Sequence, residues 1–150
     1  QFHFVIAGDG DKGERVRKLA SDLSNITLPG WVSASDAKAL LFFSTLGLAP
    51  YRQLPGCMPN KIFEYLAVGL PIISSLEGDL PVLLDQFGAG LSYSPGDRDG
   101  LIACLRKAVD SKGSLTSLRE GAVNLYKSKF VAADIYRAYA SHLEQIADVA

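Results

Sequence analysis

The sequence predicts an α/β fold, in which a parallel β-sheet is covered by helices on both faces. The first observation is that short apolar runs alternate with helical patterns of about ten residues, as in sheets built from strand–helix–strand units. The second is that this alternation gives way to helices alone after Gly113. The third is length, because 150 residues fit one domain that buries about 68–70% of its unfolded surface. We therefore expect a single domain over residues 1–150, with C-terminal helices over 113–150.

The first half of the pattern contains two strand–helix steps. Residues 4–7 form a short apolar run that ends in glycine, and the apolar residues after it are spaced as in an amphipathic helix reaching about residue 23. A second strand is expected at residues 25–28, followed by a turn at Pro29-Gly30. Ser33 or Ser35 can cap the next helix, which should end near residue 43, because a serine hydroxyl accepts a hydrogen bond from a free backbone N–H.

The second half of the chain continues the alternation of strands and helices, beginning with a strand at residues 45–50. Pro59 suits the first turn of a helix, where its missing N–H has no partner to lose, and Gly69-Leu70-Pro71 ends that helix before a strand at 72–75. A helix at 80–87, a strand at 90–93 and a helix at 97–109 complete a Rossmann-like sheet. Two more helices are expected at 115–130 and 132–146. The last carries an apolar stripe suited to docking on the domain or on a missing neighbour: Ile135, Tyr139, Leu143 and Ile146.

Composition excludes several classes of function. A net charge of −1, with 15 scattered basic residues, argues against nucleic acid as a partner, because binding phosphates needs a concentrated basic surface. Cys57 and Cys104 have no metal-ligand spacing and suggest no disulfide framework, so they are expected to be packing residues in a reducing cytoplasm. His3 and His142 join no catalytic constellation or metal cluster. We expect no metal and no cofactor.

The chain begins abruptly in an apparent strand. Residues 1–4 lack the charged start of a signal peptide, and no apolar run approaches the roughly 18 residues of a membrane-spanning helix. Because the chain starts directly inside an apparent strand, we expect the sequence to be a fragment of a larger protein.

Lys61 and Glu64 are the strongest candidates for chemistry. They are three residues apart and share one helix face, while the apolar residues of the same helix fall on another. Free backbone N–H groups and a cation at a helix start attract phosphate, and a carboxylate one turn later can accept two ribose hydroxyls. The alternative is a solvated helix pair worth about 0.2–0.5 kcal/mol. The position of the pair favours the ligand interpretation. It lies where a strand leads into a helix, at the edge formed by the carboxyl ends of the strands, and open α/β sheets bind ligands there.

The segment from Gly8 to Gly13 matches the G-x-G-x-x-G fingerprint of dinucleotide sites. The acidic residue expected about 20 positions later, at the end of the next strand, is absent. Asp9, Asp11 and Glu14 would also crowd a pyrophosphate with negative charge. An NAD-binding oxidoreductase domain is therefore the alternative function. The segment is better explained as a tight turn that needs flexible glycine, or as a glycine turn that borders another nucleotide.

Two further segments have a structural and a functional interpretation. Trp31, after Pro-Gly, is either a core residue or part of a wall against a nucleotide base. Tyr51 and Arg52 follow a strand that ends at Pro50, so they lie either in a surface loop or against a phosphate or sugar.

Taken together, the chain resembles the donor-binding C-terminal domain of the retaining glycosyltransferases of family four, which have the GT-B architecture of two facing Rossmann-like domains. Four stretches in order carry the resemblance: residues 4–10, 25–32, 47–52 and 59–73, the last being Pro-Asn-Lys-Ile-Phe-Glu-Tyr-Leu-Ala-Val-Gly-Leu-Pro-Ile-Ile. The resemblance covers nearly the whole chain. It implies that the domain's first strand and helix, and the acceptor-binding N-terminal domain, are missing.

The resemblance also implies roles for single residues. Glu64 would bind the ribose of the donor nucleotide. Lys61 and the backbone N–H groups at the helix start, which follow Pro59 and begin with Asn60, would meet the diphosphate. Trp31 and Val32 would border uracil or guanine, and Gly8 and Gly10 would line the floor of the cleft. Many members have a glutamate eight residues before the ribose-binding one, in an E-x7-E pattern, but Gly56 stands there in this chain. We interpret that change as a subfamily trait.

The function implied is retaining transfer of a hexose from a UDP- or GDP-sugar to a polysaccharide, lipopolysaccharide or lipid-linked acceptor. The intact enzyme would work in the cytoplasm, with possible peripheral contact at the inner face of the cell membrane. The fragment alone is expected to bind nucleotide weakly and to transfer no sugar. A noncatalytic interaction domain with a degenerate cleft is a third interpretation.

Overall fold

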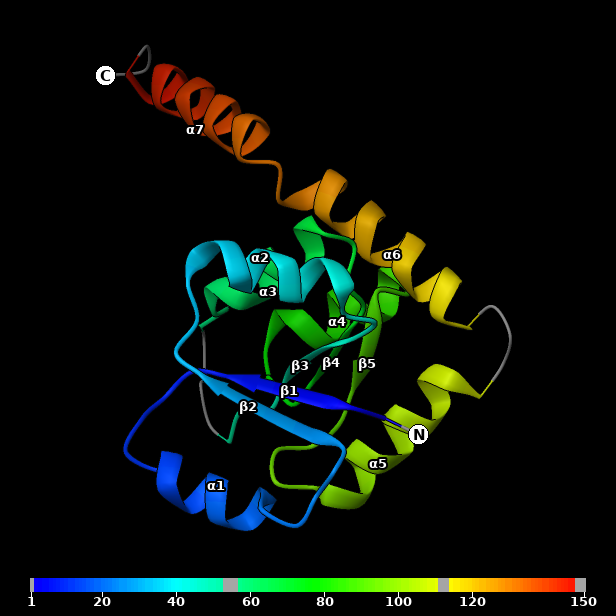
Figure 1. Cartoon of the computed structure of the whole chain (residues 1–150). Coiled ribbons are helices and arrows are strands. Elements are labelled where there is room, and N and C mark those ends of the chain that lie inside the picture. The colour runs from blue at the N-terminus through cyan, green and yellow to red at the C-terminus, as the bar shows by residue number, and fades with distance from the viewer. Residues whose placement is uncertain (1, 53–56, 111–113, 148–150) are drawn as a thin grey trace. The chain divides into compact units, whose positions relative to one another are not determined.

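The computed structural model describes residues 2–52, 57–110 and 114–147 (Figure 1). The chain divides into two compact units, Gln1–Phe43 and Ser44–Ala150. Both units are built from parallel strands linked by helices, as the alternating pattern predicts. The expectation of a single domain stays a prediction.

The first unit consists of β1 (Phe4–Ala7), α1 (Gly13–Ala20), β2 (Ile26–Gly30) and α2 (Ala34–Phe43). β1 and β2 pair in parallel, with Phe4 opposite Ile26 and an irregularity before Ala7. Of the two caps that the sequence allows for α2, Ser33 and Ser35, the structure shows Ser33, whose hydroxyl accepts a hydrogen bond of 3.1 Å from the Asp36 N–H. No residue between positions 2 and 43 is fully buried. This unit is therefore one β-α-β step followed by a helix, with little core of its own.

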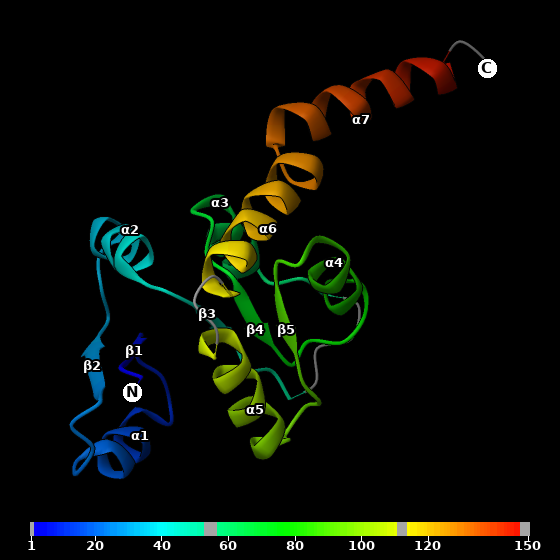
Figure 2. The ribbon, with the colours of Figure 1, turned by 90° about the vertical axis from the view of Figure 1, so that its right-hand side faces the viewer.

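The second unit has a three-stranded parallel sheet in the order β3 (Gly47–Ala49), β4 (Ile72–Ser74) and β5 (Gly90–Ser92). Each strand is joined to the next by a helix, α3 (Asn60–Ala67) and then α4 (Asp79–Phe87). Figure 2 shows these elements together with α5 (Arg98–Val109) and α6 (Ser114–Lys129). The register is regular, with Gly47 opposite Ile72 and Ile72 opposite Gly90.

The core of the second unit is centred on β4. Ile72, Ile73 and Ser74 are each at most 1% exposed, and successive strand residues face opposite sides, so both faces of this strand are covered. Each fully buried isoleucine or leucine stabilises the fold by about 1.5–3 kcal/mol. The main cluster of buried side chains is Ala49, Ile62, Leu66, Ile72, Leu76, Leu80, Leu84, Ala89, Ala122 and Leu125.

The last helix, α7 (Ala132–Ala147), buries none of its side chains. It carries exposed apolar residues at the positions that the sequence pattern predicts, from Ile135 to Ile146. In the described part of the chain, no helix has the length and apolar character needed to cross a membrane.

Several details differ from the sequence-based expectations. β2 continues through Pro29 to Gly30, where the sequence predicts a turn. α1 ends at Ala20 and not near residue 23, and β3 is shorter than the apolar run at 45–50. Pro59 lies just outside α3 in an extended conformation, with φ −63° and ψ 148°, so Asn60 is the first helical residue. Cys57 is exposed and is therefore no packing residue. For the helices and strands the reason is that a local sequence pattern indicates an element but does not fix its first and last residues.

Candidate functional site

α3 is fixed on the sheet by its apolar face. Ile62 is fully buried and Leu66 is 1% exposed, and both belong to the main core cluster. The ring of Tyr65 packs against Gly47, where a Cβ atom would lie 2.8 Å from the Tyr65 Cγ. The Tyr65 hydroxyl donates a hydrogen bond of 3.3 Å to the Leu48 carbonyl oxygen. These contacts set the rotation of α3 about its axis, and with it the direction of the opposite face.

That opposite face presents the predicted pair, Lys61 and Glu64, to solvent. No ion pair joins them, although both lie in the described part of the chain and at a spacing that permits one. Their charges are therefore not satisfied by each other and are available to a ligand.

The start of α3 has the features of an anion site. Pro59 at the cap position makes no side-chain hydrogen bond to the helix, and the first turn of the helix contains no acidic residue. The Ile62 N–H donates to the Pro59 carbonyl at 3.0 Å, whereas Asn60 and Lys61 supply the earlier N–H groups at the positive end of the helix dipole. The dipole and the Lys61 ammonium thus contribute positive potential to the same place.

Burial affects the phenol next to Glu64. Desolvation raises the pKa of Tyr65 above its ordinary value of 10.0, and the electrostatic influence of Tyr51 and Glu64 raises it further. Tyr65 is therefore a neutral hydrogen-bond donor at physiological pH. Its hydrogen bond to Leu48 links α3 to β3.

Tyr51 lies beside the start of α3. Its N–H donates to the Ser75 hydroxyl oxygen at 2.8 Å, and the Ser75 hydroxyl donates in turn to the Tyr51 carbonyl oxygen at 2.7 Å. The Lys61 Nζ lies 5.1 Å from the centre of the Tyr51 ring. Sequence reasoning missed Ser75, because its hydroxyl reaches Tyr51 only through the pairing of β3 with β4. Arg52 is exposed in the next position.

The candidate residues of the first unit follow its two strands. Gly8 comes after β1 with φ 124°, a conformation that favours glycine, and its N–H donates to the Gly30 carbonyl oxygen at 2.7 Å. Trp31, directly after β2, is 83% exposed and so lies outside the core, while Val32 is half-buried. Gly10 is exposed. These residues belong to a different unit from α3, and their sharing of one cleft with Glu64 stays a prediction. Gly56 lies outside the described residues.

In the glycine-rich turn before α1, the side-chain carboxylate of Asp9 makes the polar contacts. Asp9 Oδ1 accepts a hydrogen bond of 3.0 Å from the Gly10 N–H, and Asp9 Oδ2 pairs with the Arg17 guanidinium at 3.0 Å. A Cβ atom at Gly13 would meet the same carboxylate in its present position. Because this carboxylate places negative charge at the start of α1, where a dinucleotide's pyrophosphate would lie, the geometry disfavours the NAD alternative.

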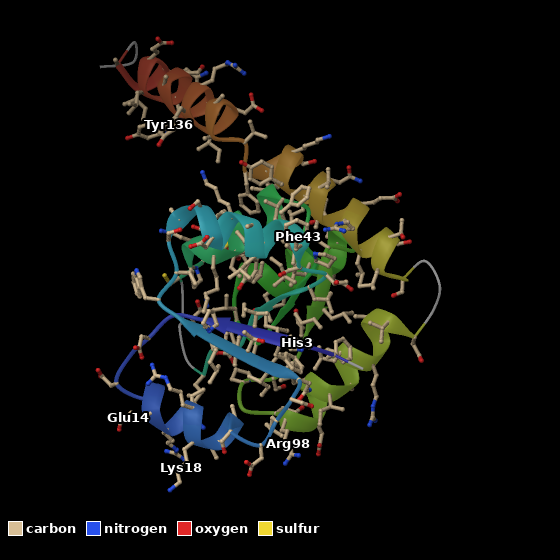
Figure 3. All side chains as sticks on the ribbon, viewed as in Figure 1. His3, Glu14, Lys18, Phe43, Arg98 and Tyr136 are labelled. Atoms are coloured by element: carbon tan, nitrogen blue, oxygen red, sulfur yellow. The ribbon has the colours of Figure 1, made fainter. Side chains whose placement is uncertain are left out.

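In the described part of the chain, the remaining titratable side chains form no second cluster of this kind. Figure 3 shows His3, the residue before β1, whose Nε2 lies 2.8 Å from the Thr27 hydroxyl, while Glu14 and Lys18 on α1 point away from the strands. Among the residues that the structure describes, no three His, Cys, Asp or Glu side chains are grouped so that they could hold a metal ion. The start of α3 is thus the best-formed site for a charged ligand.

Comparison with known proteins gives one family and several related structures. Residues 1–111 match the family described as Glycosyl transferases group 1. The amylovoran biosynthesis glycosyltransferase AmsK of Erwinia amylovora is 26% identical over 153 residues, an alignment that covers 97% of this chain and 38% of AmsK.

Solved structures agree in fold. HepE of Anabaena in complex with UDP aligns with a TM-score of 0.80 and 16% identity, over 96% of this chain and 41% of HepE. Sucrose-phosphate synthase of Thermosynechococcus elongatus aligns with a TM-score of 0.77 and 17% identity, over 97% of this chain and 38% of the synthase. The fold matches the C-terminal half of GT-B glycosyltransferases, and the chain spans about 40% of the length of these relatives.

Proposed function

Because the chain belongs to the Glycosyl transferases group 1 family, we propose that it is the nucleotide-sugar-binding part of a retaining glycosyltransferase. The donor would be a UDP- or GDP-sugar that carries a hexose. The observation that carries this proposal is the start of α3, where an uncapped helix end, the Lys61 ammonium and the Glu64 carboxylate all face solvent on a helix fixed to the core. HepE has been solved in complex with UDP and with UDP-glucose, which favours uracil as the base.

Two parts of the donor would bind at different positions along α3. The amides after Pro59 and the ammonium of Lys61 would bind the diphosphate, because both contribute positive potential. Glu64, one turn further, would accept hydrogen bonds from the two ribose hydroxyls. This order along the helix agrees with the order of phosphate and ribose in a nucleoside diphosphate sugar.

Catalysis in this proposal rests on the leaving group. When the bond from the sugar to the diphosphate breaks, negative charge grows on the departing diphosphate, and Lys61 together with the dipole of α3 stabilises that charge. These donors are already in position, so little reorganisation is needed during the reaction. No protein nucleophile is required from this part of the enzyme, and no metal or cofactor takes part.

The other candidate residues would complete the donor site. We assign Trp31 and Val32 to the edge of the base, and Gly8 and Gly10 to the floor of the cleft, where the lack of a side chain leaves room for the ligand. Arg52 would contact a phosphate or the sugar, because a guanidinium binds phosphate with paired hydrogen bonds. These assignments rest on the family resemblance of the four stretches described above.

The acceptor would be a polysaccharide, a lipopolysaccharide or a lipid-linked glycan. Support comes from AmsK, whose name places it in the biosynthesis of amylovoran. Acceptor binding would rest mainly on a further N-terminal domain, since this chain spans only about 40% of its relatives. We place the intact enzyme in the cytoplasm, with peripheral contact at the inner face of the cell membrane.

The test is UDP binding by the wild-type chain and by Glu64→Gln, measured by amide NMR titration. Hydrogen bonds to a charged group contribute about 1.5–3 kcal/mol and neutral ones about 0.5–1.5 kcal/mol, so the amide should lose about 1–2 kcal/mol. The expected result is a dissociation constant about 5- to 30-fold higher. Glu120→Gln, on the exposed surface of α6, is the matched control and should bind as the wild type does. Equal binding by all three chains would refute the role of Glu64.

A further inference from the structure

Lys61 occupies an electrostatically unfavourable position in the unliganded chain. It is the second residue of α3, where the positive end of the helix dipole repels a cation. Within the described residues, Lys61 has no acidic partner, and the first turn of α3 supplies none. An ammonium in this position needs another stabilising contact to remain beside the helix start.

That contact is the ring of Tyr51. The Lys61 Nζ lies 5.1 Å from the ring centre, inside the distance of about 6 Å at which a cation is attracted to the face of an aromatic ring. The ring itself is half-buried and packs against the main core cluster. The cation therefore rests on a surface that belongs to the core.

The backbone of Tyr51 is held as firmly as its ring. The Ser75 hydroxyl uses its oxygen to accept from the Tyr51 N–H and its hydrogen to donate to the Tyr51 carbonyl, at 2.8 and 2.7 Å. Ser75 is 3% exposed and directly follows β4, and its own N–H donates to the Ala49 carbonyl oxygen at 3.2 Å. Tyr51 is thus tied to the carboxyl ends of two neighbouring strands.

We propose that Tyr51 is a positioning residue, which holds the Lys61 ammonium beside the start of α3 so that it meets the diphosphate of the donor. A free lysine side chain has many rotamers, and binding a phosphate restricts them. The Tyr51 ring restricts them before the ligand arrives. The inference rests on the proposed function for the identity of the ligand, but the contact between Tyr51 and Lys61 belongs to the free chain.

The test compares Tyr51→Leu with Tyr51→Phe. Leucine keeps an apolar side chain but removes the aromatic face, whereas phenylalanine keeps the face and removes a hydroxyl that forms no hydrogen bond within the described part of the chain. Tyr126→Leu is the matched control, because Tyr126 packs against the same cluster and has no lysine over its ring among the described residues. Each chain is titrated with UDP, and the Lys61 side chain is followed by NMR.

The ring current of Tyr51 should shift the ε-methylene signal of Lys61 upfield in the free wild-type chain and in Tyr51→Phe. In Tyr51→Leu this shift should disappear, and the dissociation constant for UDP should rise about two- to fivefold. The loss should vanish when Lys61 is already replaced by glutamine, because the two residues act together. Tyr126→Leu should bind UDP as the wild type does.

Three results would overturn the inference: a Lys61 signal that is not shifted upfield in the wild type, a signal unchanged in Tyr51→Leu, or Tyr51→Phe binding as weakly as Tyr51→Leu. If Tyr51→Leu fails to fold, the Lys61 ε-methylene signal of the free wild-type chain still tests the contact with Tyr51. Failure of the wild-type chain to bind UDP would instead refute the proposed function, so the two failures are distinguishable.

Discussion

Gly47→Ala should destabilise the second unit, because the ring of Tyr65 occupies the space of a side chain at position 47. A Cβ atom there would lie 2.8 Å from both Cγ and Cε2 of Tyr65, closer than real Cβ contacts come. Gly47 is buried and its φ is not positive, so the effect is one of space and not of backbone conformation.

The expected change in the free energy of unfolding is the difference between two opposing effects. Forcing an extra methyl group into a packed core destabilises by about 1–3 kcal/mol. Replacing glycine by alanine also reduces the freedom of the unfolded chain, which stabilises the fold by about 0.4–1 kcal/mol. The net loss should be about 1–2 kcal/mol. Amide hydrogen exchange at Ile62 and Leu66 measures it in the second unit, and the rates should rise about 5- to 30-fold.

Two further variants test the reasoning. Gly10→Ala is a matched control, since nothing lies within 4 Å of a Cβ atom there and its φ is not positive, so its stability should not fall. In a Tyr65→Ala background, Gly47→Ala should no longer destabilise, which gives a coupling energy of about 1–3 kcal/mol. An additive double mutant, or a Gly47→Ala chain as stable as the wild type, would refute the contact as the reason for glycine.

Two other predictions concern ionisation. Since burial raises the pKa of Tyr65 above 10.0, the folded chain keeps its phenol proton at a pH where the unfolded chain loses it, so stability should fall as pH rises above about 10. Tyr65→Phe should remove this part of the fall in urea unfolding at pH 9 to 11, and an unchanged pH profile would contradict the assignment. Burial likewise raises the pKa of Cys104, whose thiol donates to the Ser92 carbonyl oxygen at 3.5 Å, whereas Cys57 is exposed. Iodoacetamide at pH 8 should therefore label Cys57 before Cys104, as read by mass spectrometry of peptides, and the reverse order would contradict it.

The sequence predicts the elements of this chain well, because each depends on local pattern. The helix from Asn60 to Ala67 shows this, since its entry proline, its exit through Gly69 and its apolar spacing are all legible without neighbours. Gly69 has φ 70°, the left-handed conformation expected of a glycine that ends a helix. The exposed positions of Lys61 and Glu64 follow from the same spacing.

Contacts between distant residues could not be predicted in this way. The packing of Tyr65 on Gly47 and the hydrogen bonds between Tyr51 and Ser75 depend on how β3 pairs with β4, and no local pattern encodes that register. The spacing of the glycines likewise does not predict the role of Asp9, whose carboxylate contacts Gly10 and Arg17. The G-x-G-x-x-G fingerprint alone therefore suggests a ligand at a place that the Asp9 side chain occupies.

The most direct test of the account is a parallel amide NMR titration of this chain with UDP, GDP and NAD. Binding of a nucleoside diphosphate at the start of α3 should move the resonances of Asn60 through Glu64 with UDP or GDP, and those of Trp31 and Val32 with the preferred base. NAD should leave both groups unchanged. Shifts confined to residues 8–14 with NAD, or no shift at α3 with either diphosphate, would contradict the central claim.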